Sequence, residues 1–130
     1  MLVTLVTSAG GTVVLSTANA RTFTGGVSAS TISPTSTNAA YNVTGTYNET
    51  YALTLPATIT VTETIATVGV KTMTVSALTA RFNGAGADAI TSTLSATGTG
   101  SFTVGGTLTV ALNQIAGIYA GTFPVSVDYN

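Results

Sequence analysis

The sequence predicts an all-β, antiparallel β-sandwich, and three observations lead to this fold class. Apolar side chains recur at every second residue along much of the chain, as at Leu108, Val110 and Leu112, and this period places alternate side chains on opposite faces of a strand. Thr supplies 29 of the 130 residues, and β-branched residues fit a half-buried sheet surface. Turn residues interrupt the pattern at intervals of roughly 8–12 residues, which is typical of a sandwich.

The first half of the chain is expected to form five strands. Gly10 and Gly11 separate the first two, and Asn19 tolerates the left-handed conformation of a turn before the third. A polar loop at Ser33–Asn38 precedes the fourth strand, and Asn48-Glu49 forms a tight connection to the fifth. The expected strands are Leu2–Val6, Thr12–Ser16, Arg21–Thr24, Tyr41–Tyr47 and Thr50–Leu55.

The second half continues the same alternation, for a total of about nine strands. Asn83–Asp88 is the clearest long loop, and Gly105-Gly106 is interpreted as a two-residue hairpin turn. The segment closest to a helix, Leu112–Ala120, is weakened by Gly117. The expected core-facing sets are Ile59, Val61 and Ile65; Met73, Val75 and Ala77; Phe102 and Val104; Leu108, Val110 and Leu112; and Phe123, Val125, Val127 and Tyr129.

Composition restricts the class of protein. A chain of 130 residues suits one domain, residues 1–130. Hydrophobic residues make up 45% and charged residues only 5%, the opposite of the balance found in disordered chains. No run approaches the ~20 apolar residues of a membrane-spanning helix, so no membrane span is expected.

The same composition argues against most chemistry. The chain contains no His and no Cys, which removes Cys/His metal sites, disulfides and His general bases. Its four carboxylates, Glu49, Glu63, Asp88 and Asp128, are far apart in sequence. Three cationic residues are too few to neutralise a nucleic-acid backbone. We therefore expect no enzyme activity, no catalytic residue, no metal site, no cofactor and no nucleic-acid partner.

The C-terminal segment is the most specific feature of the sequence. Phe123, Val125, Val127 and Tyr129 alternate up to the penultimate residue, and Pro124 is tolerated mainly in edge strands. One interpretation is an ordinary closing strand, and another is an edge that receives a strand from a second molecule. Isolated sandwiches usually protect their edges with charge, which this chain almost lacks.

Two resemblances add to this interpretation. From about Gly11 to Asn130 the chain resembles a family of secreted bacterial β-domains catalogued as domain of unknown function 4402. The residues that carry this resemblance are Gly11-Thr12-Val13, Arg21–Val27, Tyr51–Pro56, Phe102–Leu108 and Gly117–Phe123. The C-terminal strand also resembles that of chaperone–usher pilins, which have a Gly fourteenth from the end and a penultimate Tyr, the places of Gly117 and Tyr129.

The pilin resemblance implies an immunoglobulin-like, pilin-like sandwich that lacks one strand and is completed by the N-terminal strand of a neighbouring copy. The donor strand is expected either in residues 1–7, with Leu2 and Val6 or Val3 and Leu5 facing inward, or outside this sequence. Many such pilins carry a disulfide, which this chain cannot form. The expected subunit-interface residues are Leu2, Val3, Leu5, Val6, Gly117, Phe123, Val125, Val127 and Tyr129.

These observations predict a secreted structural subunit of a fibre, pilus or matrix on a bacterial surface. Its expected partners are copies of itself, with a chaperone and usher secretion system implied by the resemblance. The alternative is a monomeric adhesin or carbohydrate-binding sandwich using exposed tyrosines. The Thr-rich run Thr58–Thr62 also raises ice binding, although that activity usually needs a flat repeated face and no sequence repeat is visible.

Overall fold

The computed structural model describes residues 3–5, 10–29, 38–63, 69, 72–114 and 119–129. The described part of the chain is all β, without a helix, and its antiparallel sheets pack as a sandwich, which confirms the predicted fold class. Its strands are β1 (Val3–Leu5), β2 (Gly11–Leu15), β3 (Arg21–Gly25), β4 (Val27–Ala29), β5 (Ala39–Thr44), β6 (Thr50–Thr54), β7 (Thr58–Glu63), β8 (Thr72–Phe82), β9 (Thr91–Thr93), β10 (Thr99–Val110), β11 (Tyr119–Ala120) and β12 (Ser126–Tyr129).

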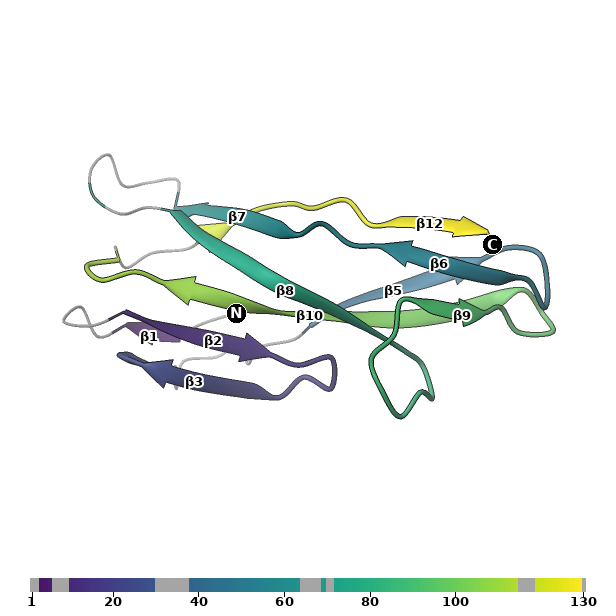
Figure 1. The fold of residues 1–130 in the computed structure, drawn as a ribbon, viewed down its shortest axis with the longest axis horizontal. Coiled ribbons are helices and arrows are strands. Elements are labelled where there is room, and N and C mark those ends of the chain that lie inside the picture. Colours follow the sequence, from purple (N-terminus) through teal and green to yellow (C-terminus); the bar gives the residue numbers. More distant parts are fainter. Residues whose placement is uncertain are drawn as a thin grey trace.

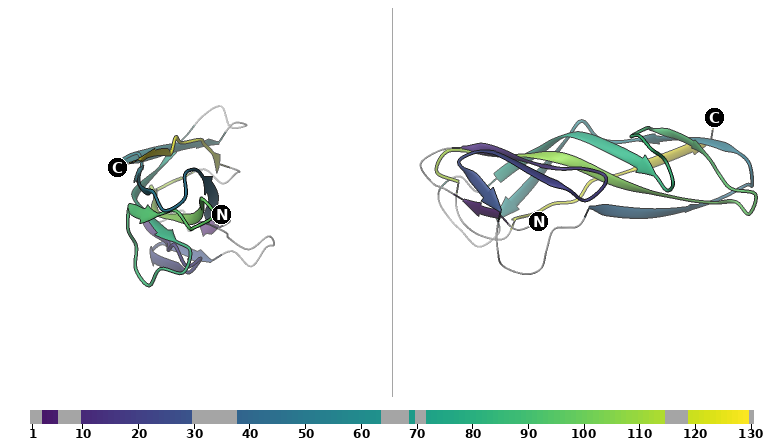
Figure 2. Two further views of the ribbon diagram at one scale, coloured as in Figure 1. Left: turned by 90° about the vertical axis from the view of Figure 1, so that its right-hand side faces the viewer. Right: turned by 90° about the horizontal axis from the view of Figure 1, so that it is seen from below.

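The strands form three sheets (Figure 1). The largest has the order β11-β7-β8-β10-β2-β3. The strand β5 pairs with the first half of β10, Thr99–Val104, whereas β2 pairs with its second half, Gly106–Val110. The second has the order β12-β6-β9, and the third pairs β1 with β4. All of these pairings are antiparallel, so the molecule consists of one long sheet partly covered by two smaller ones (Figure 2).

The chain changes sheets between β6 and β7. These strands are separated only by Leu55, Pro56 and Ala57, yet β6 belongs to the three-stranded sheet and β7 to the large one. Pro56 has no N–H to donate, so a sheet ladder breaks easily there. The C-terminal segment follows the same path in reverse, because β11 pairs β7 and β12 pairs β6.

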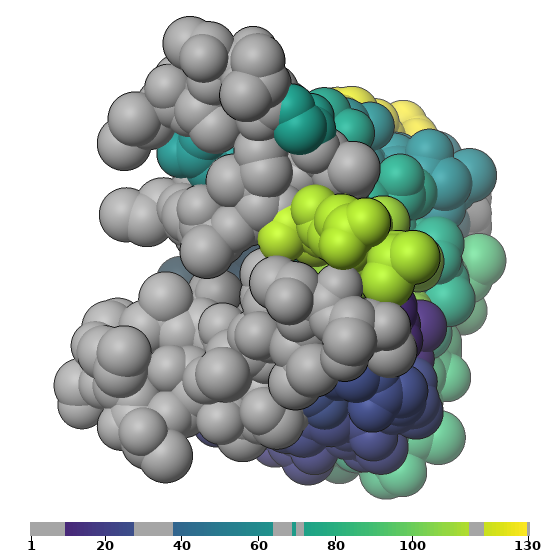
Figure 3. Space-filling view, turned by 90° about the vertical axis from the view of Figure 1, so that its left-hand side faces the viewer, coloured from purple at the N-terminus to yellow at the C-terminus, as the bar shows by residue number. Residues whose placement is uncertain are grey.

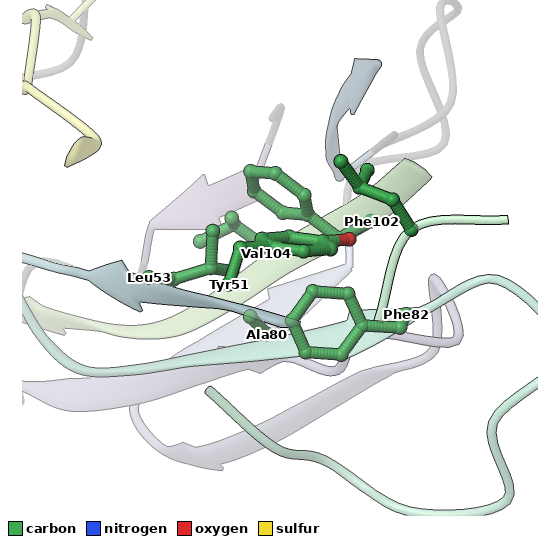
Figure 4. Packing of buried hydrophobic residues seen from close by; sticks show 7 residues of the cluster. Tyr51, Leu53, Ala80, Phe82, Phe102 and Val104 are labelled. Atoms are coloured by element: carbon green, nitrogen blue, oxygen red, sulfur yellow. The ribbon is translucent and has the colours of Figure 1, made fainter. Parts of the chain in front are cut away.

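The first hydrophobic cluster lies between the three-stranded sheet and one half of the large sheet. Tyr51 packs edge-on against Phe82, with ring centroids 5.5 Å apart (Figure 4). Tyr41 stacks on Phe102, with ring centroids 5.1 Å apart. Offset and edge-on aromatic pairs stabilise a core beyond the area that they bury. The buried members of the cluster are Tyr51, Leu53, Ala80, Phe82, Leu94, Phe102 and Val104.

The second cluster lies at the other end of the molecule. It joins Val13 of β2 and Met73 of β8 to Val27 of β4, so the small β1–β4 sheet lies against this half of the long sheet. Figure 3 views this end, where residues that follow β10 (yellow-green) reach the surface. The expectation that Leu112 faces the core with Leu108 and Val110 is wrong, because Leu112 is 54% exposed.

The predicted hairpin turn at Gly105-Gly106 is wrong. Both glycines lie inside β10, a single strand of 12 residues. A Cβ on Gly105 would overlap the Leu15 backbone oxygen, and one on Gly106 would lie 2.9 Å from Val75 Cγ1. Glycine is therefore needed there for close packing of neighbouring strands, one of the two roles that a strand glycine can have.

Ala77 also departs from the expected pattern, which placed it on the inward face with Met73 and Val75. It is exposed and has a φ of 51°. The pairing of β8 with β10 shifts register between Gly105 and Thr107, so β8 contains a β-bulge. The bulge changes the phase of the alternation, and Ala80 and Phe82 then continue the buried face.

Other expectations hold or fall outside the described residues. The Asn48 turn is confirmed, with Asn48 at a φ of 59°, and Asn83–Asp88 is a loop.

Residues 115–118, in the segment that came closest to a helix in the sequence, lie outside the described part. No helix long and apolar enough for a bilayer occurs in the part of the chain that the structure describes. An immunoglobulin-like strand order remains a prediction.

Candidate functional site: an open side of the sandwich

One side of the sandwich around the first cluster is closed by the segment between β8 and β9. The Ala89 N–H donates to the Ala80 oxygen on β8 at 2.9 Å, and the Leu53 N–H on β6 donates to the Ile90 oxygen at 2.7 Å. Two adjacent residues thus connect an edge of each sheet through backbone hydrogen bonds.

The opposite side is bounded by β5 and β12. Within the described residues β5 pairs only with β10, and β12 pairs only with β6, so each has one edge without a partner strand. Both strands lie at the same end of the molecule (Figure 1). We call the region between these two edges the open side. At one end of the open side a hydrogen bond connects the two layers, because the Thr46 N–H after β5 donates to the Tyr129 hydroxyl of β12 at 3.1 Å.

The core-facing side chains of β12 are exposed at this open side. Val127 lies opposite Leu53 and Tyr129 lies opposite Tyr51 in the register of β12 and β6. Opposed residues of an antiparallel pair share a face, and Leu53 and Tyr51 are only 3% and 1% exposed. Val127 is nevertheless 41% exposed and Tyr129 58%. Both lie on β12, which is at the edge of its sheet, whereas β6 has a strand on each side.

Half-buried apolar side chains line both margins of the open side. Phe123 and Val125, which precede β12, pack against the first cluster from one margin. Ala39, Tyr41 and Val43 of β5 pack against the same cluster from the other margin. A strand placed between the margins would therefore meet apolar surface on both, together with two free backbone edges.

Of the sequence-predicted interface residues, Phe123, Val125, Val127 and Tyr129 come together along one margin. Val3 and Leu5 belong to β1 and lie opposite Ala29 and Val27 of β4 rather than beside β12. Leu2, Val6 and Gly117 lie outside the described residues.

Sequence reasoning missed β5 as the second margin. The alternation at Ala39, Tyr41 and Val43 predicts a strand, and these three side chains are half-buried while the residues between them are exposed. That pattern does not distinguish a central strand from an edge, because both bury one face.

A polar cluster joins the β8–β9 loop to the large sheet and to the β2–β3 turn. The Asp88 Oδ1 atom accepts hydrogen bonds from the Thr17 hydroxyl at 2.6 Å and from the Arg81 Nε at 2.8 Å. The bond from Thr17, aided by Arg81, holds the pKa of Asp88 below its usual value. Asn38 donates to the Thr17 oxygen at 2.6 Å, as does the Thr103 hydroxyl at 2.8 Å. The cluster links the β2–β3 turn, β5, β8 and β10.

A shallow depression of about 430 Å³ lies at the end of the sandwich near Tyr51 and Phe82. Burial raises the pKa of the Tyr51 hydroxyl, while a hydrogen bond with Ser92 opposes that shift. The other lining side chains are hydroxyls and amides, such as Ser92 and Asn83. No group of three or more His, Cys, Asp or Glu side chains that could hold a metal ion occurs in the described residues.

Comparisons with known proteins support the first of the two resemblances seen in the sequence and give no match to pilins. Searches of curated proteins and of solved structures returned no match. A family model described as a domain of unknown function, DUF4402, matches residues 3–129, which covers every strand described above. The chain therefore belongs to the DUF4402 family.

Proposed function

We propose that this protein is a structural subunit of a bacterial extracellular fibre or surface matrix, and that copies associate non-covalently by strand complementation at the open side. The observation that carries the proposal is the exposure of Val127, which faces the same side as the buried Leu53. An inserted strand would cover this face and pair with the free edge of β12.

The physical gain comes from two sources. Each apolar side chain that becomes fully buried contributes roughly 1.5–3 kcal/mol, and each backbone hydrogen bond to the inserted strand adds about 1 kcal/mol net. The near-absence of charge supports the proposal as well, because charged side chains are a common means of keeping sheet edges apart. β12 carries one charged residue, Asp128, whose neighbours Val127 and Tyr129 point to the opposite face.

Residues 1–7 are the proposed donor strand. Within the chain, β1 pairs with β4 over three residue pairs, Val3↔Ala29, Thr4↔Ser28 and Leu5↔Val27. A short pairing of this kind is small enough to exchange for a longer one, and exchange of an identical element between copies is a low-cost route to association. Secretion to the cell surface through a chaperone and usher remains part of the proposal, supported by the pilin-like C-terminal pattern.

Engineered cysteines test both the donor and the acceptor, because the natural chain has no Cys. One preparation carries Val3→Cys and the other Val127→Cys, and the two are mixed under mild oxidation. We expect a disulfide-linked heterodimer, and filaments of the natural chain in electron micrographs. A matched control places Cys at Ser126, which precedes Val127 on the same strand and points to the opposite face.

Two results would contradict the proposal. One is a natural chain that is monodisperse and monomeric at high concentration. The other is equal cross-linking of Val3→Cys to the Ser126→Cys and Val127→Cys chains, since this would show random collision rather than a defined register.

A second candidate is a monomeric adhesin or carbohydrate-binding domain. Tyr47, at the β5–β6 turn, is 65% exposed, and exposed aromatic rings can stack on sugars. The depression lined by Ser92 and Asn83 offers neutral hydrogen-bonding groups nearby. A glycan-array signal that Tyr47→Ala abolishes in a monomeric preparation would favour this candidate over the fibre subunit.

A further inference from the structure

Threonines on the exposed face of the large sheet form rows that cross five strands. The register pairs Thr60 with Thr74, Thr74 with Thr109, Thr109 with Thr12, and Thr12 with Thr24. One continuous row therefore contains Thr60, Thr74, Thr109, Thr12 and Thr24, from β7, β8, β10, β2 and β3 respectively.

A second row runs beside the first, two residues along each strand. It is made of small, mostly β-branched side chains, four of them hydroxylated, and consists of Thr58, Ser76, Thr107, Val14 and Thr22. Val14 is 37% exposed and has the shape of Thr with a methyl group in place of the hydroxyl. The two rows together form a surface that we call the threonine array.

The threonine array faces away from the core. Thr60, Thr74, Thr109 and Thr24 are exposed, whereas the residues beside them in sequence, such as Val13 and Leu108, are buried in the second cluster. The covering β4 strand packs against that buried face through Val27. In the row, the Thr12 and Thr24 hydroxyls are 2.5 Å apart and hydrogen-bonded to each other.

The spacing of the array follows from sheet geometry. Adjacent strands are ~4.8 Å apart, and two residues along a strand span ~6.7 Å. These two repeats are in the range of the distances between oxygen rows in the lattice of hexagonal ice. Each Thr hydroxyl can donate and accept hydrogen bonds, while its methyl group excludes bulk water. A regular set of both groups can hold a layer of water in an ordered arrangement.

Other ligand classes fit the array poorly. None of its ten side chains is charged or aromatic, so it offers neither an ion pair to an anionic partner nor a ring for a sugar to stack on. We propose that the threonine array is an ice-binding surface, with the ordered water of the ice lattice as its ligand. This site is separate from the open side and does not depend on the proposed fibre role.

Sheet twist decides where the lattice match is best. Neighbouring strands rotate by roughly 20–25° relative to one another, so a flat ice plane meets only a few strands at once. The central strands β8, β10 and β2 carry Thr74, Thr109 and Thr12. Substitutions at these positions should therefore have the largest effect on ice binding.

The test is ice-affinity partitioning together with inhibition of ice recrystallisation. The probe is the full chain in slowly frozen solution beside a reference protein that does not bind ice. Thr109→Tyr places a bulky ring in the centre of the array while keeping a residue that suits a strand. Thr54→Tyr is the matched control, because Thr54 is an exposed Thr of β6 in the other sheet.

The natural chain and Thr54→Tyr are expected to enter the ice and slow recrystallisation. Thr109→Tyr is expected to fall to the level of the reference protein, with its melting temperature close to that of the natural chain. If Thr109 belongs only to a stabilising cross-strand ladder, the natural chain will partition like the reference protein, and the proposal is wrong. Equal activity of Thr109→Tyr and Thr54→Tyr would also overturn it.

Val127→Asp separates this inference from the fibre role. Because Val127 lies in the other sheet, we expect that variant to lose assembly and keep its ice binding. Binding to crystalline cellulose at the same level as to ice would instead identify a general hydroxylated surface and overturn the assignment of ice as the ligand.

Discussion

Val127 and Leu53 lie opposite each other on β12 and β6 and share one face of their sheet, yet Leu53 is 3% exposed and Val127 is 41% exposed. The difference follows from their places in the sheet, because β6 lies between β12 and β9 whereas β12 is an edge strand. The pair thus lies where the buried first cluster meets apolar side chains that are partly exposed to solvent.

Val127→Asp is expected to abolish assembly while leaving the monomer folded. A carboxylate at a partly exposed site can stay hydrated in the monomer, so the free energy of unfolding should change by about 1 kcal/mol or less. Burying it under an inserted strand would require desolvation of a charge. Size-exclusion chromatography with light scattering and denaturant unfolding measure the two effects. Ser126→Asp, on the opposite face, should still assemble, and its failure to do so would argue against a face-specific interface.

Gly105→Ala is expected to destabilise the fold by about 1–3 kcal/mol, the usual cost of overpacking. Its Cβ would overlap the Leu15 backbone oxygen, and backbone cannot move aside as a flexible side chain can. Gly86→Ala is the control, since a Cβ there meets nothing within 4 Å, and it should change stability by about 0.5 kcal/mol or less. Chemical denaturation compares them. Equal stability of the two variants would contradict the structural role of Gly105.

Asp88 should make stability depend on pH in the acid range. Its folded pKa is lowered from the usual 3.8, mainly by the hydrogen bond from Thr17, so the folded state favours the ionised form. The resulting stability is present above pH 3.8 and is lost as the pH falls through the lower folded pKa. In Thr17→Val the pKa of Asp88 should rise toward 3.8, as measured by carbon NMR of the carboxyl group. An unchanged pKa of Asp88 in that variant would show that the Thr17 hydroxyl does not lower it.

Phe102→Ala should cost about 3–5 kcal/mol, the usual range for deleting a buried ring. Phe102 is 3% exposed and contacts both Tyr41 and Phe82, so the cavity would remove ring contacts within the large sheet. Tyr47→Ala is the comparison, because Tyr47 is 65% exposed and its loss should be nearly neutral. Thermal unfolding ranks the two, and a similar melting temperature for both would mean that the first cluster is not the stabilising core.

Tyr129→Phe tests the hydrogen bond between the Thr46 N–H and the Tyr129 hydroxyl at the end of the open side. Removing the hydroxyl leaves the Thr46 N–H without its 3.1 Å acceptor. That N–H is near solvent and can bind water, so the loss should be about 0.5–1.5 kcal/mol at most. Amide hydrogen exchange at Thr46 should accelerate, and unchanged exchange would show that the hydroxyl does not hold this turn.

Much of the fold is readable from local pattern. The two-residue period and the turn residues predict an all-β chain, and they locate strands such as β3 and β6 to within a residue or two, because alternation and turn preference depend on neighbours in sequence. The low charge and the lack of His and Cys restrict the chemistry directly. The alternation at Phe123, Val125, Val127 and Tyr129 is likewise a local pattern, and it is enough to single out the C-terminal segment.

Pairing lies beyond such patterns, since it brings together residues far apart in the chain. Gly105-Gly106 has the composition of a turn, and only the close approach of Leu15 and Val75 explains why β10 runs straight through it. The phase change at Ala77 arises from the register of β8 against β10. In the same way, Leu53 lies on the central strand of its sheet and Val127 on an edge strand, and the threonine rows exist only because five strands align in register. Burial and register are properties of the packed sheets, and they determine where the open side and the threonine array lie.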